Sequence, residues 1–245
     1  SGGRTPKELY ELLAKEEALA PGAVGMVDER FVLQSRINTS HDNSNEKMMK
    51  ETGLLSYLEL RDIPFYSMLQ KSPQPPLSRG STKDLSLLDK GPDVGGRLLD
   101  RGGSVPQDGG FITREETAEL YDEKIRSLNA IFQKSVALLG IGSDGHTAGI
   151  PVRKLKVKSE KLKVYDNYDL VTEYNDTDGV YGERVTMTFL GLSMMDLLVV
   201  LVFGDDKKEA LEWMFQNGSE EEIPARFYKR PEIAQKTIII TDQNI

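Results

Sequence analysis

Apolar residues along the chain fall into short continuous runs separated by stretches with helical spacing. The runs 135–142 and 197–204 are apolar at nearly every position, which is typical of strands covered on both faces of a parallel sheet. Residues 236–242 close this set of strands, and 113–132 and 206–218 show the periodicity of helices. Strands that alternate with helices predict right-handed crossovers and a parallel sheet.

The N-terminal half predicts shorter elements of the same kinds. Leucines and a tyrosine at helical spacing predict a helix over 5–19. Thr5 and Thr113 are the expected N-caps of two helices, because Glu8 and Glu116 follow them at the spacing of a capping box. The remaining expected elements are strands over 23–31 and 63–68 and a helix over 44–58.

Two segments fit no single element. Residues 184–196 are apolar and are compatible with either a strand or a helix. Residues 72–110 hold 13 of the 33 glycines and prolines and too few apolar side chains to offset the entropy of ordering. We therefore expect one α/β domain over 1–245 with an inserted mobile loop at 72–110.

The charge and the cysteine content exclude several classes of function. There are 31 basic and 39 acidic residues, a net charge of −8, which disfavours nucleic acid and anionic membranes as partners. A small anionic substrate needs only a few local cations and stays possible. The absence of cysteine excludes disulfides, thiolate metal sites and a cysteine nucleophile, and it fits a reducing cytoplasm.

Membrane insertion is not expected from the sequence. The longest apolar stretch, 189–204, is interrupted by Asp196 and is too short to span a bilayer. The opening residues include no hydrophobic leader. The sequence thus predicts a soluble, cytoplasmic protein.

Residues suited to chemistry follow three predicted strands. Asp28 and Arg30 come after 23–27, at the charged end of the first strand, Asp144 and His146 follow 135–141, and Lys207 follows 197–203. In open α/β sheets ligands bind beyond the carboxyl ends of the strands, so these side chains are candidates for one site. The alternatives are a structural histidine, a surface ion pair and a solvated lysine.

The opening Ser1-Gly2-Gly3 leads directly into a predicted helix. Small residues before a helix N-terminus allow backbone amides to close around an anion. Glycines in this position also form ordinary turns. Because such a loop normally follows a strand, we expect that a strand and a helix precede Ser1.

His146 is one of two histidines in the chain. Histidine ionises near neutral pH and suits general-base work, and Asp144 is placed to orient it. Glycines at 140, 142 and 145 are expected to keep the backbone open to a ligand.

The segment "LLGIGSDGHTAGIP" (138–151) resembles the histidine motif of the 6-phosphogluconolactonases, whose wider family also contains glucosamine-6-phosphate deaminases. Other segments resemble motifs of this family in the same order: "SGGRTPKELYELL", "VDERFV" followed by "NSN", "RVTMTFLGLSMMD", "VFGDDKKEALEWM" and "IPARF". The resemblance covers most of the chain except 72–110 and 152–180. It implies a three-layer, Rossmann-like α/β sandwich with a mostly parallel sheet.

The resemblance also implies a reaction and its residues. The reaction is hydrolysis of 6-phospho-D-glucono-1,5-lactone to 6-phosphogluconate in the oxidative pentose phosphate pathway, without cofactor or metal, by a monomer or small homo-oligomer. His146 is then the general base, and Asp28 and Asp144 complete the catalytic group. The implied substrate and phosphate contacts are Ser1, Gly2, Gly3, Arg4, Thr5, Arg30, Asn45, Gly145, Arg184 and Lys207.

The chain departs from the family pattern at several positions. Arg4 replaces a serine, Asn43 replaces an aspartate, and "AGIPV" replaces the usual residues after the histidine. Two alternatives therefore stay open. A glucosamine-6-phosphate deaminase is disfavoured by "DERF" and "HTAGIP", and a non-catalytic sugar-phosphate binding protein is suggested by the altered loop and the insertion.

Overall fold

The computed structural model describes residues 4–16, 20–31, 44–69, 112–152, 164, 168–176 and 182–244. Its elements in chain order are α1 (Arg4–Glu16), β1 (Val24–Gly25), β2 (Asp28–Arg30), α2 (Asn45–Glu51), α3 (Leu54–Leu60), β3 (Phe65–Tyr66), α4 (Arg114–Ile131), β4 (Val136–Gly140), β5 (Val171–Asp176), β6 (Gly182–Met187), α5 (Phe189–Ser193), β7 (Leu197–Val202), the 3-10 helix η3 (Asp205–Lys207), α6 (Lys208–Phe215), the 3-10 helix η4 (Pro224–Lys229), α7 (Pro231–Ala234) and β8 (Thr237–Thr241).

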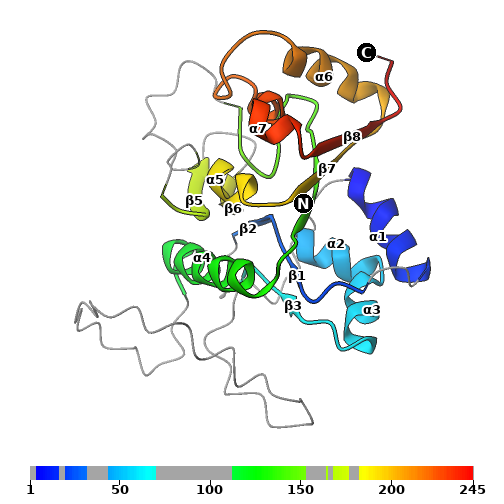
Figure 1. The fold of residues 1–245 in the computed structure, drawn as a ribbon, viewed down its shortest axis with the longest axis vertical. Coiled ribbons are helices and arrows are strands. Elements are labelled where there is room, and N and C mark those ends of the chain that lie inside the picture. The colour runs from blue at the N-terminus through cyan, green and yellow to red at the C-terminus, as the bar shows by residue number, and fades with distance from the viewer. Residues whose placement is uncertain are drawn as a thin grey trace.

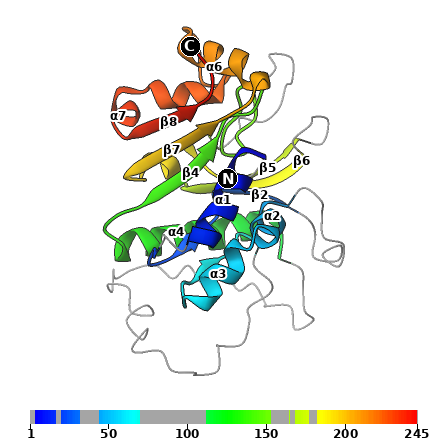
Figure 2. The ribbon, with the colours of Figure 1, turned by 90° about the vertical axis from the view of Figure 1, so that its right-hand side faces the viewer.

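The described strands form two parallel sheets and one antiparallel sheet. The order β4-β7-β8 and the pair β1-β3 are parallel, whereas β2-β6-β5 is antiparallel. The helices α6 and α7 lie beside β8 at one end of the molecule and α3 lies at the other end, while α1 packs against β4 and β7 and α5 against β6 (Figures 1 and 2). The α/β fold with parallel strands expected from the sequence is confirmed, but the antiparallel sheet was not foreseen.

Two groups of buried apolar side chains hold these elements together. The larger joins the parallel and antiparallel sheets to α4, α5, α6 and η4, with the fully buried Leu139, Leu198, Met214 and Phe227 among its members. The smaller is centred on α1, α2 and α3. Burial of apolar surface is the main force that stabilises such layers.

Helix α4 covers one face of the antiparallel sheet. Its N-cap Thr113 and Glu116 form the predicted capping box, with both reciprocal hydrogen bonds present. Arg114 forms ion pairs with Glu173 on β5 (2.5 Å) and Glu183 on β6 (2.8 Å). These contacts fix α4 on one face of the antiparallel sheet. The opposite face carries Asp28, Arg30 and Arg184.

The range 23–31 forms two strands and not the single one expected, because the chain changes sheets in its middle. β1 pairs with β3 and β2 pairs with β6. Between them, the buried Tyr121 hydroxyl accepts a hydrogen bond from the Met26 amide (2.6 Å) and donates one to the Met26 carbonyl (3.0 Å). A side chain from α4 therefore satisfies the backbone where a strand ladder was expected.

Two helix predictions also need correction. The helix over 44–58 is broken at Gly53, which has φ +80° and separates α2 from α3. The first helix begins at Arg4, so Thr5 lies in its first turn and is not the N-cap.

Strand 135–142 is less buried than expected. Only alternate residues of β4 are buried, and Val136 is 58% exposed. The segment 184–196 contains both predicted elements, the end of β6 and then α5, while β5 was not anticipated. The insertion 72–110 lies outside the described residues. No helix in the described ranges combines the length and the apolar character needed to cross a bilayer.

Candidate active site

A tight turn after β4 carries His146. The Gly142 amide donates to the His146 carbonyl (2.8 Å), and the Gly145 amide donates to the Gly142 carbonyl (2.9 Å). Gly145 has φ +91°, a conformation that glycine adopts without the penalty imposed by a side chain. The turn therefore fixes the direction in which the imidazole leaves the backbone.

His146 forms a close pair with Asp144. The ring Nδ1 lies 2.6 Å from Asp144 Oδ1, which also accepts the His146 amide at 3.1 Å. Because a carboxylate only accepts hydrogen bonds, this contact selects the tautomer with the proton on Nδ1. The basic nitrogen of the neutral ring is then Nε2. The side chain is 35% exposed and so is not a core histidine.

The absence of a side chain at Gly142 makes room for the His146 ring and not for a ligand. A Cβ atom at this position would lie 2.1 Å from the ring Nδ1 and Cε1. The space that the sequence suggested for a ligand is filled by the imidazole. A Cβ at Gly140, in contrast, would meet nothing closer than 3.5 Å.

Hydroxyl groups of the antiparallel sheet hold the other end of the turn. Ala148 (φ +51°) and Gly149 (φ +68°) both adopt left-handed conformations. Thr186 on β6 donates to the Ala148 carbonyl, and Tyr174 on β5 donates to the Gly149 carbonyl at 2.5 Å. A Cβ at Gly149 would lie 2.9 Å from Asp28 Oδ2. The turn after β4 thus lies directly on the sheet face that carries Asp28.

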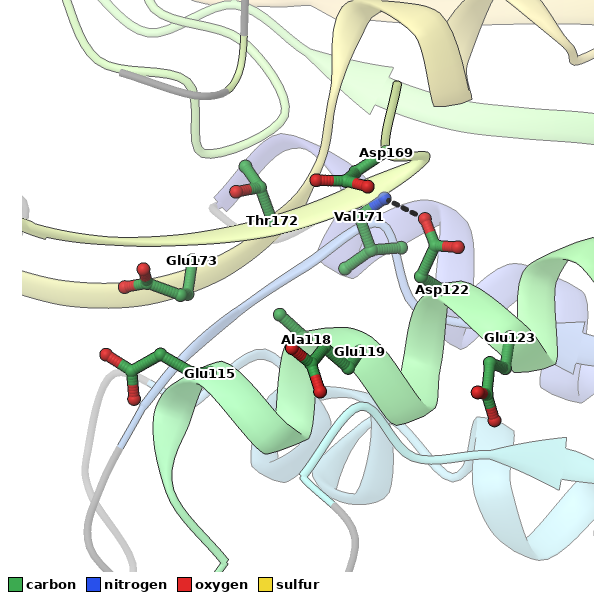
Figure 3. A pocket seen from close by; sticks show the side chains of 9 residues that line it. All are labelled: Glu115, Ala118, Glu119, Asp122, Glu123, Asp169, Val171, Thr172 and Glu173. Atoms are coloured by element: carbon green, nitrogen blue, oxygen red, sulfur yellow. Dashed lines mark hydrogen bonds between the residues drawn. The ribbon is translucent and has the colours of Figure 1, made fainter. Parts of the chain in front are cut away.

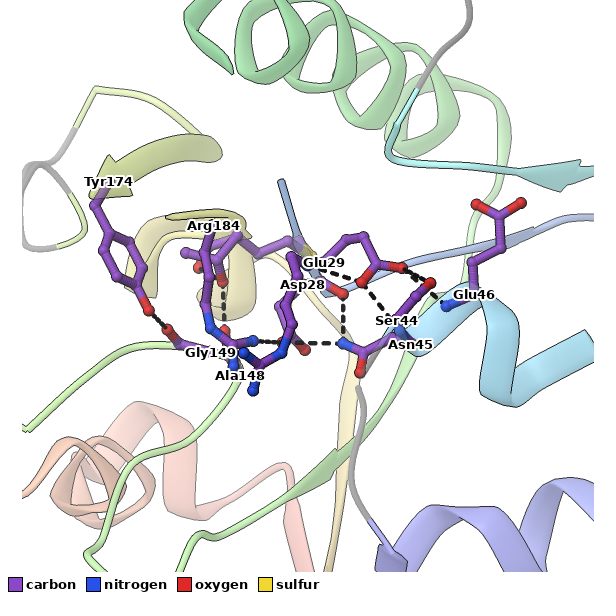
Figure 4. A network of polar contacts seen from close by, with 12 residues as sticks. Asp28, Glu29, Ser44, Asn45, Glu46, Ala148, Gly149, Tyr174 and Arg184 are labelled. Carbon is purple, nitrogen blue, oxygen red and sulfur yellow. Dashed lines mark hydrogen bonds and ion pairs between the residues drawn. The ribbon is translucent and has the colours of Figure 1, made fainter. Parts of the chain in front are cut away.

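Asp28 is the centre of a buried polar network (Figure 4). It is 3% exposed, and its Oδ2 forms an ion pair with Arg184 Nη1 at 3.0 Å. The Asn45 side-chain amide donates to the Asp28 carbonyl (2.8 Å) and to Oδ2 (3.1 Å). Three of the residues singled out from the sequence are therefore in direct contact, although they come from β2, α2 and β6.

Glu29 fastens this network to the start of α2. Its carboxylate accepts hydrogen bonds from the amides of Arg30, Asn45 and Glu46 and from the Ser44 hydroxyl, all between 2.7 and 3.0 Å. Burial raises the pKa of Glu29, and the three amides act in the opposite direction. In the sequence, only the position of Glu29 inside the Asp-Glu-Arg segment points to this role.

Arg30 and Arg184 lie directly opposite each other on β2 and β6, so their side chains share one face. Burial, and then the charge of Arg184, lower the pKa of Arg30. Arg184 is paired with Asp28, whereas no carboxylate of the described residues forms an ion pair with Arg30. A partly buried guanidinium beside a second one is a suitable site for an anion.

Fewer contacts are described for Lys207 and for the opening residues 1–5. Lys207 lies in η3 after β7 and forms an ion pair with Asp206 (3.3 Å). Ser1, Gly2 and Gly3 lie outside the described residues, and only the backbone of Arg4 and Thr5 is described. Burial, and then the charge of Asp28, raise the pKa of Tyr10 on α1.

A hollow of about 280 Å³ lies between α4 and β5 (Figure 3). Six carboxylates line it: Glu115, Glu119, Asp122, Glu123, Asp169 and Glu173. This concentration of negative charge repels an anion. Across the described residues, no three side chains of the ligating types are grouped to hold a metal ion.

The fold is a sugar-phosphate isomerase-like α/β fold, in which the turn that carries the histidine–aspartate pair lies over the sheet face of Arg30 and Arg184. The chain belongs to the glucosamine-6-phosphate isomerase/6-phosphogluconolactonase family, whose family model matches residues 1–239.

Individual relatives agree with this family assignment. The chain is 25% identical over 227 residues to a 6-phosphogluconolactonase of Rhizobium meliloti, covering 92% of this chain and 76% of the relative. It is 28% identical over 230 residues to one of Synechocystis, covering 93% and 75%.

Solved structures described as 6-phosphogluconolactonases share the fold. The one from Thermotoga maritima has a TM-score of 0.58 at 23% identity, covering 98% of this chain and 82% of that one. The one from Shewanella baltica has a TM-score of 0.61 at 19% identity, covering 98% and 79%.

Proposed function

We propose that the protein hydrolyses 6-phospho-D-glucono-1,5-lactone to 6-phosphogluconate, the second step of the oxidative pentose phosphate pathway. The observation that carries this proposal is the Arg30–Arg184 pair on the sheet face over which the His146 turn lies. In the proposal, the arginines bind the phosphate and the imidazole acts at the lactone carbonyl, the two ends of the substrate. The names of the relatives support the same activity, and the family match over 1–239 supports a single domain.

In this proposal the phosphate binds to Arg30, with Lys207 and the amides of residues 2–5 as further contacts. Asp28, which accepts a hydrogen bond from Asn45, forms an ion pair with Arg184 and fixes its guanidinium on the sheet face shared with Arg30. Asp28 is then a positioning residue for Arg184. Gly145 gives the turn its left-handed conformation, and the space where a Cβ would lie is filled by Ile223.

His146 is the general base of the proposed reaction. Nε2 accepts a proton from water as the water oxygen attacks the lactone carbonyl carbon, and the Asp144 carboxylate stabilises the imidazolium that forms. When the tetrahedral intermediate collapses, the bond from the carbonyl carbon to the ring oxygen breaks. The imidazolium returns its proton to that oxygen, so one water molecule is consumed and the base is regenerated.

Acid release at constant pH, corrected for spontaneous lactone hydrolysis, tests this function. Because a positioned base contributes about 10²- to 10⁴-fold, His146→Gln is expected to lower kcat by at least about tenfold. Arg30→Gln is expected to act mainly on KM, since it removes a charge that binds substrate in both ground and transition states. Arg61→Gln removes an equal charge at the end of α3 and serves as the control.

Ammonia release and ligand binding, measured beside acid release, separate the alternative functions. Ammonia release from glucosamine 6-phosphate in place of acid release from the lactone contradicts the proposal and favours a deaminase. Binding of 6-phosphogluconate with no hydrolysis above the spontaneous rate indicates a sugar-phosphate binding protein. An unchanged kcat in His146→Gln removes this residue from the mechanism.

A further inference from the structure

The 3-10 helix η4 (Pro224–Lys229) contacts the His146 turn in addition to the antiparallel sheet. The Ala225 amide, in η4, donates to the Gly145 carbonyl (3.0 Å). The Tyr228 hydroxyl, also in η4, lies 2.5 Å from Thr147 Oγ1. The two contacts fall on the residues immediately before and after His146.

The hydroxyl groups form a chain with a defined direction. Thr147 Oγ1 donates its single hydrogen to the Gly140 carbonyl at the end of β4 (2.8 Å). The Tyr228 hydroxyl must then be the donor to Thr147. Burial raises the pKa of Tyr228, so the phenol keeps the proton that this contact needs. Thr147 is fully buried and Tyr228 is 3% exposed, so water does not compete for these bonds.

Aromatic stacking and an arginine fix the position of η4. Phe227 stacks on Phe189 of α5, with ring centroids 4.7 Å apart. The Arg230 guanidinium lies over both rings, 5.5 Å and 5.1 Å from their centroids. Glu220 holds that guanidinium through two hydrogen bonds of 2.7 Å. Tyr228 is therefore presented to the turn by a well-packed support.

We propose that Tyr228 is a positioning residue for His146, acting through the Thr147 hydroxyl. This inference rests on the proposed function, in which His146 is the base. Tyr174 and Thr186 hold the carbonyls of Gly149 and Ala148, and Tyr228 holds Thr147, the residue next to His146. Small displacements of a catalytic group are costly, because catalysis depends on the alignment of the reacting atoms.

The test compares variants that remove one hydroxyl at a time. Since misplacement by about 1 Å can cost about 100-fold, Tyr228→Phe is expected to lower kcat by about tenfold and to change KM by less than about twofold. Thr147→Val breaks the same chain of hydrogen bonds and is expected to lower kcat as much as Tyr228→Phe does. Thr147→Ser keeps the hydroxyl and is expected to have a kcat close to that of the wild type. The double variant Tyr228→Phe/Thr147→Val is expected to be no worse than either single variant, because both act on one chain of bonds.

Thr117→Val is the matched control. Thr117 is also a buried threonine whose hydroxyl donates to a backbone carbonyl, that of Thr113 (2.7 Å), but it lies on α4. All variants are assayed well below their melting temperatures, so that unfolding does not contribute. An unchanged kcat in Tyr228→Phe overturns the inference, as does a Thr147→Ser variant as slow as Thr147→Val.

Amide hydrogen exchange gives a readout that does not depend on lactonase activity. The Gly142 amide is bonded to the His146 carbonyl and reports whether the turn is closed. Its exchange is expected to be at least about tenfold faster in Tyr228→Phe than in the wild type and unchanged in Thr117→Val. If the wild-type protein fails to hydrolyse the lactone, the proposed function fails and exchange alone decides. Unchanged exchange in Tyr228→Phe overturns the inference whatever the activity.

Discussion

At the scale of single residues, the buried pair Asp28–Arg184 has the largest predicted effect on stability. The two side chains are 4% and 10% exposed, so each charge depends on the other, and Asn45 donates a hydrogen bond to the Asp28 carboxylate. Arg184→Met leaves the Asp28 carboxylate buried without its cation, which is expected to cost about 3–5 kcal/mol of unfolding free energy. Chemical denaturation of the purified variant measures this loss.

Arg126→Met provides the comparison on the surface of α4. Arg126 pairs with Asp122 at 2.5 Å, but its side chain is 50% exposed. An exposed pair of this kind contributes about 1 kcal/mol or less. If both substitutions cost the same, burial is not what makes the Asp28 pair important.

Sequence reasoning identified the charged residues of the site but not the hydroxyls that place them. Asp28, Arg30, Asp144 and His146 could be named because they follow apolar runs in short, recognisable segments. Tyr174 lies in a segment with no such signal. Its role arises only when β5 comes to lie under the turn after β4. The same holds for Tyr228, whose hydrogen-bond partner is 81 positions away.

At the scale of elements, two glycines with positive φ make a matched pair. Gly145 has φ +91°, and a Cβ there would lie 2.9 Å from Ile223 Cγ2; Gly182 has φ +63° and no atom within 4 Å of a Cβ. Gly182→Ala is expected to cost about 1–2 kcal/mol through the left-handed backbone alone, with kcat unchanged. Gly145→Ala is expected to cost more and to lower kcat, because Ile223 must move and η4 with it.

Denaturation and lactone hydrolysis are measured on both glycine variants. Together they separate the cost of the left-handed backbone from the cost of the contact with Ile223. Equal losses of stability in the two variants would mean that the Ile223 side chain moves aside at little cost in free energy. A normal kcat in Gly145→Ala would mean that the turn tolerates displacement of its support.

The elements with strong periodicity were predictable and the short ones were not. Thr113 and Glu116 define the start of α4 from local chemistry alone, and the capping box is present as expected. The division of 23–31 into β1 and β2 depends on the Tyr121 hydroxyl, which arrives from a distant helix. Local sequence does not contain that information, so tertiary contacts override the strand signal.

At the scale of the whole molecule, charge is distributed unevenly over the antiparallel sheet. The face under α4 borders a hollow lined by six carboxylates, while the opposite face presents Arg30 and Arg184. A net charge of −8 does not favour anions in general. The paired arginines therefore have to supply a local attraction, which makes the phosphate the anchor of the proposed substrate.

This anchor leads to a prediction for ligand binding to the folded protein. A ligand that binds only the native state stabilises it by about 2.7 kcal/mol at a free concentration of about 100 times Kd. We expect 6-phosphogluconate to give this increase in the wild type, and gluconate, which lacks the phosphate, to give almost none at the same concentration. Arg30→Gln is expected to remove most of the effect and Arg61→Gln to leave it intact, as measured by denaturation at fixed ligand concentration. Equal stabilisation by gluconate and 6-phosphogluconate would show that the sugar acid, and not the phosphate, provides the binding free energy.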